Sequence, residues 1–135
     1  MPSKTLWSRA WTGPKTNGEA YNDYLQGQYF RERRDREDLS RSVGYYEQAI
    51  KSDPGYALAW AGLSVARMFQ ATIGYLPFDE GCRKAREAAE RALALDANLA
   101  ESNAAVGNVK FLCDWDWASA HAWTSPILKQ TRRST

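Results

Sequence analysis

Hydrophobic residues recur at helical spacing along the chain between residues 19 and 123. Segments with an apolar side chain every three or four positions alternate there with short polar breaks, as expected for amphipathic helices. Asp35 and Asp79 are suitable helix caps, and a helix should end before Pro54 because the residue ahead of a proline avoids the helical conformation. No segment alternates like a β-strand for long enough to compete. The pattern predicts an all-α fold, with helices beginning near Glu19, after Asp35, near Ala57, after Asp79, after Asn98 and at Trp117.

A unit of the pattern recurs along this helical region. Asp53 and Asp96 follow equivalent helices 43 residues apart, and Ala97 stands where the first unit has Pro54. Two sets of four positions have the same internal spacing, with steps of 4, 3 and 5 residues. The sets are Ser42, Tyr46, Ala49 and Pro54, and Ala85, Ala89, Ala92 and Ala97. In the preceding helices, Trp60, Leu63 and Ser64 align with Asn103, Val106 and Gly107, and Gly27 and Phe30 hold the corresponding place in the first unit. Self-similarity of this kind predicts a helix-turn-helix repeat.

The repeat resembles the tetratricopeptide repeat (TPR), with its Trp-x2-Leu-Gly, Ala-x3-Phe-x2-Ala and Pro signature. "WAGLS" together with "SVGYYEQAIKSDP" carries most of the likeness. It departs from the family by three extra residues between the helices of unit one, by about nine in unit two ("ATIGYLPFD"), and by Ala97 and Asn103 in place of Pro and Trp. The resemblance implies an α-α superhelix of about three helix-turn-helix units, the last one incomplete, in units of about 19–55, 56–98 and 99–123.

The segments "EAYNDYLQGQYF", "GYALAWAGLSVA" and "NVKFLCDWDWASA" are also similar to TPR segments of bacterial signalling and transcriptional regulatory proteins. In those proteins the array follows a winged-helix, cyclase or protein-kinase module. This chain has no room for such a module, so the resemblance implies a fragment, a stand-alone relative or a remnant of a longer regulator. Two functions remain open, a scaffold that binds a partner and a regulatory segment that acts by self-association.

The first helix of each TPR-like pair is expected to line a concave surface. Such a surface would be mostly apolar and aromatic, which suits a bound peptide or helix. The alternative is that Met68, Phe69 and Phe111 belong to the core or lie beneath the inserted loop, because apolar stripes at helical spacing are more often core. The residues predicted to contact a partner are Tyr21, Tyr24, Gln28, Leu58, Val65, Met68, Phe69, Glu101, Asn108, Phe111 and Leu112.

The two ends of the chain lack the repeat pattern. Residues 1–18 are rich in Pro, Gly, Ser, Thr and Lys and predict a flexible leader or linker. Residues 124–135 predict an irregular or frayed tail, because Pro126 falls inside the expected last helix, where a proline costs about 3 kcal/mol. A shortened last unit would leave apolar surface uncovered, so a homodimer through the C-terminal end is expected.

Composition and charge narrow the possible partners. The 135 residues are 44% hydrophobic and 25% charged, and 18 basic residues nearly balance 16 acidic ones for a net charge of +2. This balance argues against nucleic acid and against a membrane surface as partners. The run "RERRDRED", residues 31–38, alternates in sign and predicts a solvated helix junction. The N-terminal segment has no apolar core of a signal peptide and no run could span a bilayer, so the predicted location is cytoplasmic.

Residues suited to catalysis or metal binding are few. Cys82, Cys113 and His121 offer three ligands where a structural zinc site usually needs four, and both cysteines are expected to be reduced thiols. His121 has no partner motif for a nucleophile and base pair, and Asp114 with Asp116 is better explained as a turn and a helix cap. No phosphate-binding glycine motif is present. The sequence therefore predicts a protein that is not an enzyme and binds no cofactor.

Overall fold

The computed structural model describes residues 18–114, and that range folds into five α-helices with no strand. The helices are α2 (Gly18–Arg33), α3 (Arg36–Ser52), α4 (Ala57–Ile73), α5 (Phe78–Leu95) and α6 (Ala100–Cys113). The all-α prediction is confirmed for this range. Gly18, assigned from the sequence to the leader, is the first residue of α2. The rest of the predicted leader, the helix expected at Trp117 and the tail 124–135 lie outside the described residues.

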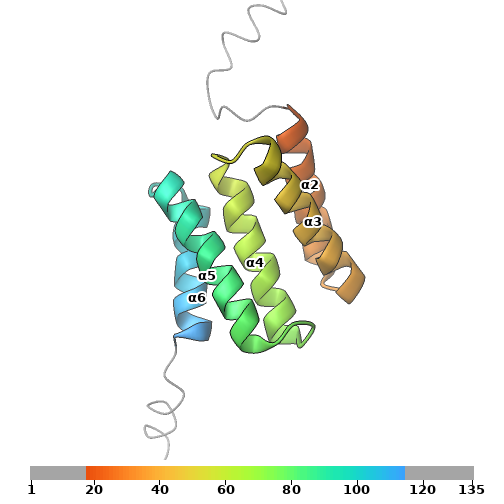
Figure 1. Ribbon diagram of the computed structural model, residues 1–135, viewed down its shortest axis with the longest axis vertical. Helices are drawn as coiled ribbons and strands as arrows, with labels where there is room; N and C mark the ends of the chain where they lie inside the picture. The colour runs from red at the N-terminus through yellow and green to blue at the C-terminus, as the bar shows by residue number, and fades with distance from the viewer. Residues whose placement is uncertain (1–17, 115–135) are drawn as a thin grey trace, which may run out of the picture.

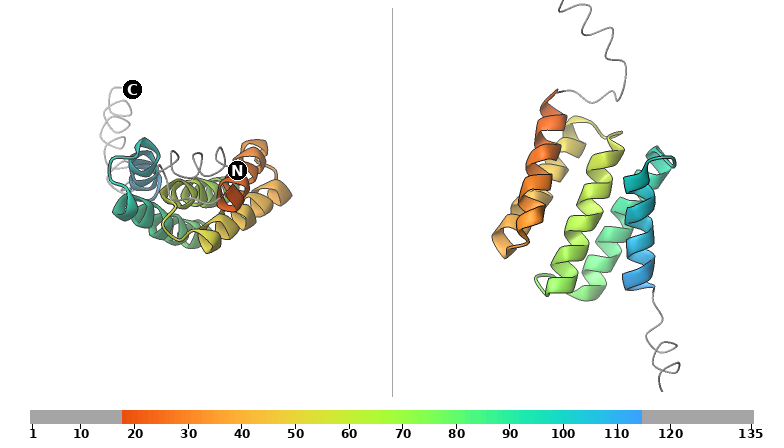
Figure 2. Two further views of the ribbon diagram at one scale, coloured as in Figure 1. Left: turned by 90° about the horizontal axis from the view of Figure 1, so that it is seen from above. Right: turned by 180° about the vertical axis from the view of Figure 1, so that it is seen from behind.

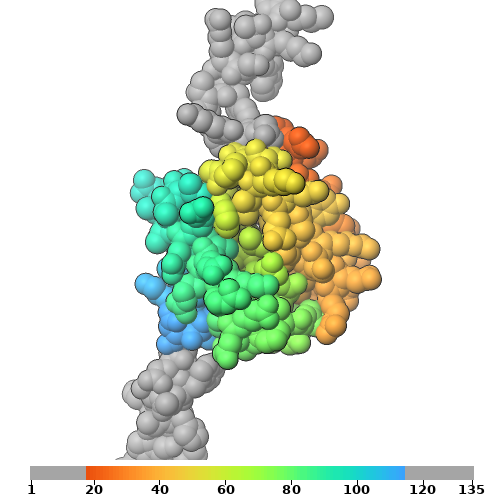
Figure 3. Space-filling model, viewed as in Figure 1, coloured from red at the N-terminus to blue at the C-terminus, as the bar shows by residue number. Residues whose placement is uncertain are grey.

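The helices form a curved array of two layers (Figures 1 and 2). Seen from above, α2, α4 and α6 lie on the inner, concave side, and α3 and α5 lie on the outer, convex side. The most extensive helix contacts join α2 to α3 and α4 to α5, so neighbours in sequence pack as pairs. In the space-filling view, side chains of α3 and α5 cover most of the convex face and leave only part of α4 visible (Figure 3).

The turns after α3 and α5 contain the same hydrogen bonds at equivalent positions. After α3, the Asp53 carboxylate accepts the backbone N–H of Gly55 at 3.2 Å. After α5, the Asp96 carboxylate accepts the backbone N–H of Asn98 at 3.1 Å. This Asx turn is a local structure that an aspartate favours, because its short side chain reaches the backbone two residues on. The aspartates that mark the sequence repeat therefore form the same turn twice.

A second hydrogen bond, between residues six positions apart, is duplicated beside each turn. The indole Nε1 of Trp60 donates to the carbonyl oxygen of Pro54 at 2.9 Å. The side-chain amide of Asn103 donates to the carbonyl oxygen of Ala97 at 2.8 Å. Asn103 replaces the tryptophan of the motif, but its amide makes the equivalent bond, which ties the new helix back to the turn that precedes it. Both positions thus keep one structural role although the residue types differ.

Within each pair, a buried serine hydroxyl links the two helices. Ser42 on α3 donates to the carbonyl oxygen of Gly27 on α2 at 2.6 Å, and Ser64 on α4 donates to that of Ala85 on α5 at 2.8 Å. In the repeat register these are the same two positions, with the serine on the second helix in one pair and on the first helix in the other. Small side chains at this place let the two backbones approach closely enough for the bond to form.

The second pair has both longer helices and a longer connection than the first, since α4 and α5 have 17 and 18 residues against 16 and 17 for α2 and α3. α4 continues to Ile73, and Gly74 then ends the helix with φ 95°, the left-handed conformation that glycine adopts readily. α5 begins at Phe78 with Pro77 as its N-cap residue. The prediction of Asp79 as the cap was therefore wrong by two positions, and its carboxylate lies in the first turn, where negative charge favours the helix dipole. Asp35, in contrast, does occupy the N-cap position of α3, although its side chain makes no capping hydrogen bond.

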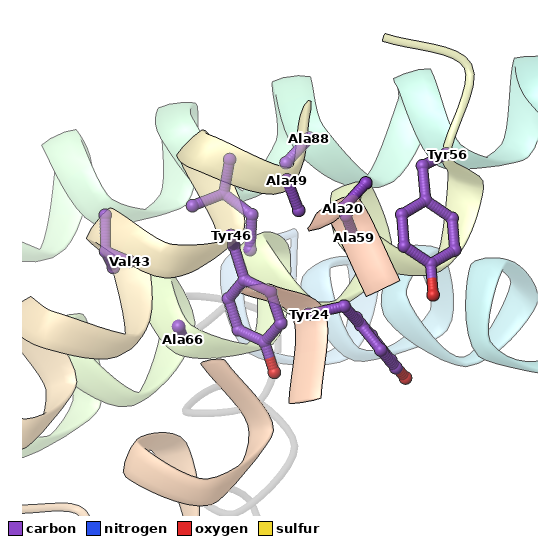
Figure 4. Close-up of a cluster of buried hydrophobic side chains, with 10 residues drawn as sticks. Ala20, Tyr24, Val43, Tyr46, Ala49, Tyr56, Ala59, Ala66 and Ala88 are labelled. Atoms are coloured by element: carbon purple, nitrogen blue, oxygen red, sulfur yellow. The ribbon is translucent and has the colours of Figure 1, made fainter. Parts of the chain in front are cut away.

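The main core cluster centres on tyrosines that come from different parts of the chain (Figure 4). Tyr46 of α3 is fully buried, and its ring lies 5.9 Å from that of Tyr24 on α2, centroid to centroid. Tyr24 in turn lies 5.4 Å from Tyr56, which precedes α4. Alanines surround these rings, so large side chains pack against small ones across the helix contacts.

Candidate functional site

The inner surface of α2, α4 and α6 is the candidate binding site, because the residues predicted to contact a partner all lie on these three helices (Figure 2). Their exposure varies widely. Tyr21, Glu101 and Phe111 are exposed, Tyr21 by 48% and Phe111 by 64%. The partly buried members are Gln28, Leu58, Val65, Phe69, Asn108 and Leu112. Tyr24 and Met68 are buried.

Tyr24 takes part in the core but reaches the inner surface through its hydroxyl. The amide of Gln28 donates to that hydroxyl at 2.8 Å, one helical turn further along α2. Burial raises the pKa of Tyr24, the charge of Arg31 opposes the shift, and the charge of Glu101 adds to it. Glu101 lies on α6, so this charge comes from the other side of α4.

Met68 lies in the second core cluster, which joins α4, α5 and α6. It is only 1% exposed, and its sulfur lies 3.6 Å from the sulfur of Cys113. This burial agrees with the core alternative for Met68. A partner on the inner surface could reach Met68 only if α6 moved.

A cation covers one face of Phe69. The guanidinium of Arg34 lies 4.3 Å from the centre of the Phe69 ring, a distance typical of a cation–π contact. Arg34 has φ 56° in the short connection between α2 and α3, a left-handed conformation that is uncommon for a residue with a side chain. The sequence suggested that the inserted loop of unit two might cover this phenylalanine, whereas the cover observed on its ring comes from unit one.

The sequence prediction omitted two exposed apolar residues of α2. Leu25 is 41% exposed and Tyr29 is 57% exposed, and with Tyr21 they recur every four residues along one side of the helix. The guanidinium of Arg33 lies 5.8 Å from the centre of the Tyr29 ring. The four-residue spacing was visible in the sequence. It was not informative on its own, because core stripes have the same spacing.

The structure corrects the prediction for the two cysteines. Cys82, near the start of α5, and Cys113, at the end of α6, form a disulfide with their Cα atoms 5.8 Å apart. The sequence separation of 31 residues gave no indication of this pairing. The two helices run in opposite directions, so the first turns of one lie beside the last turn of the other. That packing brings the Cα atoms to a separation at which a disulfide can form.

An ion pair lies beside the disulfide. Arg86 of α5 holds the carboxylate of Asp114 in a bidentate arrangement, with both terminal nitrogens donating and the Nη1 bond at 2.8 Å. These hydrogen bonds lower the pKa of Asp114 and raise that of Arg86. Asp114 follows α6 as its C-cap, as the prediction of a turn requires. Asp116 and His121 lie outside the described residues.

Acidic, histidine and cysteine side chains do not gather elsewhere into a metal-binding group within residues 18–114. None of the helices described there has the length and apolar character needed to cross a bilayer. No family model, curated protein or solved structure matches this chain. The case for a function therefore depends on the repeated turns and on the chemistry of the inner surface.

Proposed function

We propose that this chain is a tetratricopeptide-type scaffold that binds a peptide or protein partner on the inner surface of α2, α4 and α6 and has no catalytic role. The observation that carries the proposal is the exposure of large side chains on this layer, with Tyr21 on α2 and Phe111 on α6 at its two edges. Between them, Leu58 and Val65 of α4 are only partly buried. A surface with apolar side chains in its middle and aromatic side chains at its edges suits the apolar face of a helix or an extended peptide.

The charges near this surface favour a partner with apolar anchors over a highly charged one. One acidic and one basic side chain influence this surface, since the charge of Glu101 raises the pKa of Tyr24 and the charge of Arg31 lowers it. Arg31 in turn lies 3.3 Å from Glu32, in an ion pair that offsets its charge. Nucleic acid is not expected as a partner, because binding to phosphates requires several uncompensated cations.

A random peptide library displayed on phage is a suitable probe, since the partner is unidentified. Peptides selected on the full chain should lose affinity for Tyr21→Glu and for Asn108→Glu, as measured by fluorescence anisotropy. Leu95→Glu is the matched control, because Leu95 is exposed to a similar degree, 42%, but lies on α5 in the outer layer. Selected peptides that bind both inner-surface variants as tightly as the unmodified chain would contradict the proposal.

A second candidate is self-association through the C-terminal end, as in a regulatory or oligomerisation segment of a larger signalling protein. A groove of about 240 Å³ lies between α5 and α6 and is lined by the apolar side chains of Ala89, Leu93, Val106 and Val109. Its other lining residues include Glu90 and Lys110, whose opposite charges could pair between two copies related by a two-fold axis.

Light scattering over a range of concentrations tests this second candidate. Val106→Glu should abolish a concentration-dependent dimer because it places a charge in the groove, whereas Leu95→Glu on α5 should leave the dimer intact. A strict monomer at the highest concentration would exclude self-association.

The proposed location of the protein remains the cytoplasm, where a disulfide would be exposed to reducing thiols.

A further inference from the structure

The disulfide between Cys82 and Cys113 lies at the boundary between the second core cluster and the surface. Both cysteines line a groove of about 450 Å³ at the start of α5, together with Phe78, Asp79 and Arg83. Cys82 is 9% exposed, whereas Cys113 is partly exposed. The groove is therefore the side from which a thiolate would approach, and Cys113 is the more exposed of the two residues.

The fully buried side chains of α6 are small or medium in size. They are Ser102, Ala105 and Val109, whereas Val106 and Leu112 pack against the second core cluster while partly buried. Its first turn is held by hydrogen bonds, since Ser102 donates to the carbonyl oxygen of Ala92 at 3.1 Å and Asn103 donates to that of Ala97. This end of α6 would stay in place without the disulfide.

The last turn of α6 depends more strongly on the covalent bond. The neighbouring pair of Arg86 and Asp114 is exposed, and exposed ion pairs contribute little to stability. Cys113 also contacts the sulfur of Met68, but this contact involves the cysteine whose position the disulfide fixes. Without the bond, the end of α6 that carries Asn108, Phe111 and Leu112 would be held by noncovalent contacts, among them the packing of Val109 and Leu112 in the second core cluster.

We propose that Cys82 and Cys113 form a reversible thiol–disulfide exchange site whose reduction by a dithiol frees the last turns of α6 from α4 and α5. The dithiol attacks Cys113 Sγ as a thiolate, a mixed disulfide forms, and Cys82 leaves as a thiolate. The second thiolate of the reductant then displaces Cys113 and leaves as a cyclic disulfide. Two electrons pass to the protein, and the two protons of the dithiol end on the cysteine thiols.

The consequence for binding rests on the proposed function. Release of the last turns of α6 would displace Asn108, Phe111 and Leu112 from the inner surface and uncover Met68, so the oxidised chain would bind a peptide more tightly than the reduced chain. The release itself is independent of any partner. It can be tested without a binding assay, so that failure of one proposal is distinguishable from failure of the other.

The experiment follows amide hydrogen exchange by mass spectrometry in the full chain, with dithiothreitol as the reductant. After oxidation, reduction should speed exchange in residues 108–113 by about tenfold or more, while amides of α2 and α3 remain protected, as expected for local opening. The double variant with Cys82→Ser and Cys113→Ser should exchange quickly with and without reductant. Asp114→Asn is the matched control, because it removes the ion pair and leaves the disulfide, and the oxidised variant should stay protected.

Two results would overturn the proposal. One is the titration of two free thiols in the chain after refolding in a glutathione redox buffer, which would show that the pair does not form. The other is unchanged exchange in α6 after complete reduction of the unmodified chain. The second measurement needs no variant, so it remains decisive even if the double serine variant fails to fold.

Discussion

The ring of Tyr46 on α3 lies directly against the backbone of Gly62 on α4. A Cβ atom built on Gly62 would lie 2.5 Å from Tyr46 Cε1, closer than such atoms can pack. Gly27 on α2 approaches the same ring from another side, where a Cβ would lie 2.7 Å from Cε1. One buried tyrosine thus occupies the space left by two glycines and joins the first helix pair to the second.

This contact predicts opposite effects of the same substitution at two helical glycines. Gly62→Ala should destabilise the fold by about 1 to 3 kcal/mol, because the added methyl group overpacks against a fully buried ring. Gly44→Ala, also in a helix but with nothing within 4 Å of its Cβ position, should stabilise the fold by about 1 kcal/mol through helix propensity. Urea denaturation of both variants measures the difference, and equal effects would show that Tyr46 moves aside.

We predict that the hydroxyl of Ser64 stabilises the pairing of α4 with α5 through its hydrogen bond to Ala85. Ser64→Ala should cost about 0.5 to 1.5 kcal/mol relative to Ser40→Ala, because only the first substitution removes an interhelical hydrogen bond. Ser40 is exposed on α3, so its substitution reports the change in helix propensity alone. Identical unfolding midpoints for the two variants would mean that the bond adds nothing to stability.

Removal of the Tyr46 hydroxyl should stabilise the protein. This hydroxyl is buried and forms no hydrogen bond of good geometry within the described residues, because the nearby Ser42 hydroxyl, which slightly opposes the rise in its pKa, donates its proton to Gly27 instead. An unsatisfied buried polar group costs about 1 to 3 kcal/mol. Tyr46→Phe keeps the ring that fills the space beside Gly62 and is expected to raise the melting temperature in calorimetry. Tyr29→Phe is the control, since Tyr29 is exposed and its substitution should change the melting temperature little. A lower melting temperature for Tyr46→Phe would reveal a partner for the hydroxyl.

Alkaline pH should weaken the fold through the buried tyrosines. Burial raises the pKa of Tyr46 far above its usual value of 10.0 and raises that of Tyr56 to about 12. Above pH 10 the unfolded chain loses these protons while the folded chain retains them, so stability falls as pH rises, for Tyr56 until about pH 12. Denaturation curves at increasing pH should show a smaller loss for Tyr46→Phe than for the unmodified chain.

Reduction of the disulfide should lower the free energy of unfolding by about 3 to 4 kcal/mol, because a link across 31 residues restricts the unfolded chain. Denaturant curves with and without dithiothreitol measure this change. The double variant with Cys82→Ser and Cys113→Ser should show no effect of the reductant. A response of that variant would mean that the reductant acts elsewhere.

Sequence alone determined the features that arise from short-range interactions. The all-α fold, the end of α3 before Pro54 and the equivalence of Asp53 with Asp96 depend on residues within about one or two helical turns, so the local pattern was sufficient. The N-cap of α5 was misplaced at Asp79 because an aspartate is favourable both at the cap and in the first turn. The residue type therefore could not distinguish the two positions.

Tertiary structure decided which member of each apolar stripe is buried and which faces outward. Met68 and Phe69 are adjacent in one helix, yet Met68 is in the core while Arg34 from the preceding unit covers Phe69. The pairing of Cys82 with Cys113 likewise follows from the antiparallel packing of α5 and α6. Each of these outcomes depends on how whole helices are placed against each other. Helical spacing specifies the face of a helix but not the neighbour that packs on it, so these contacts could be seen only in the folded chain.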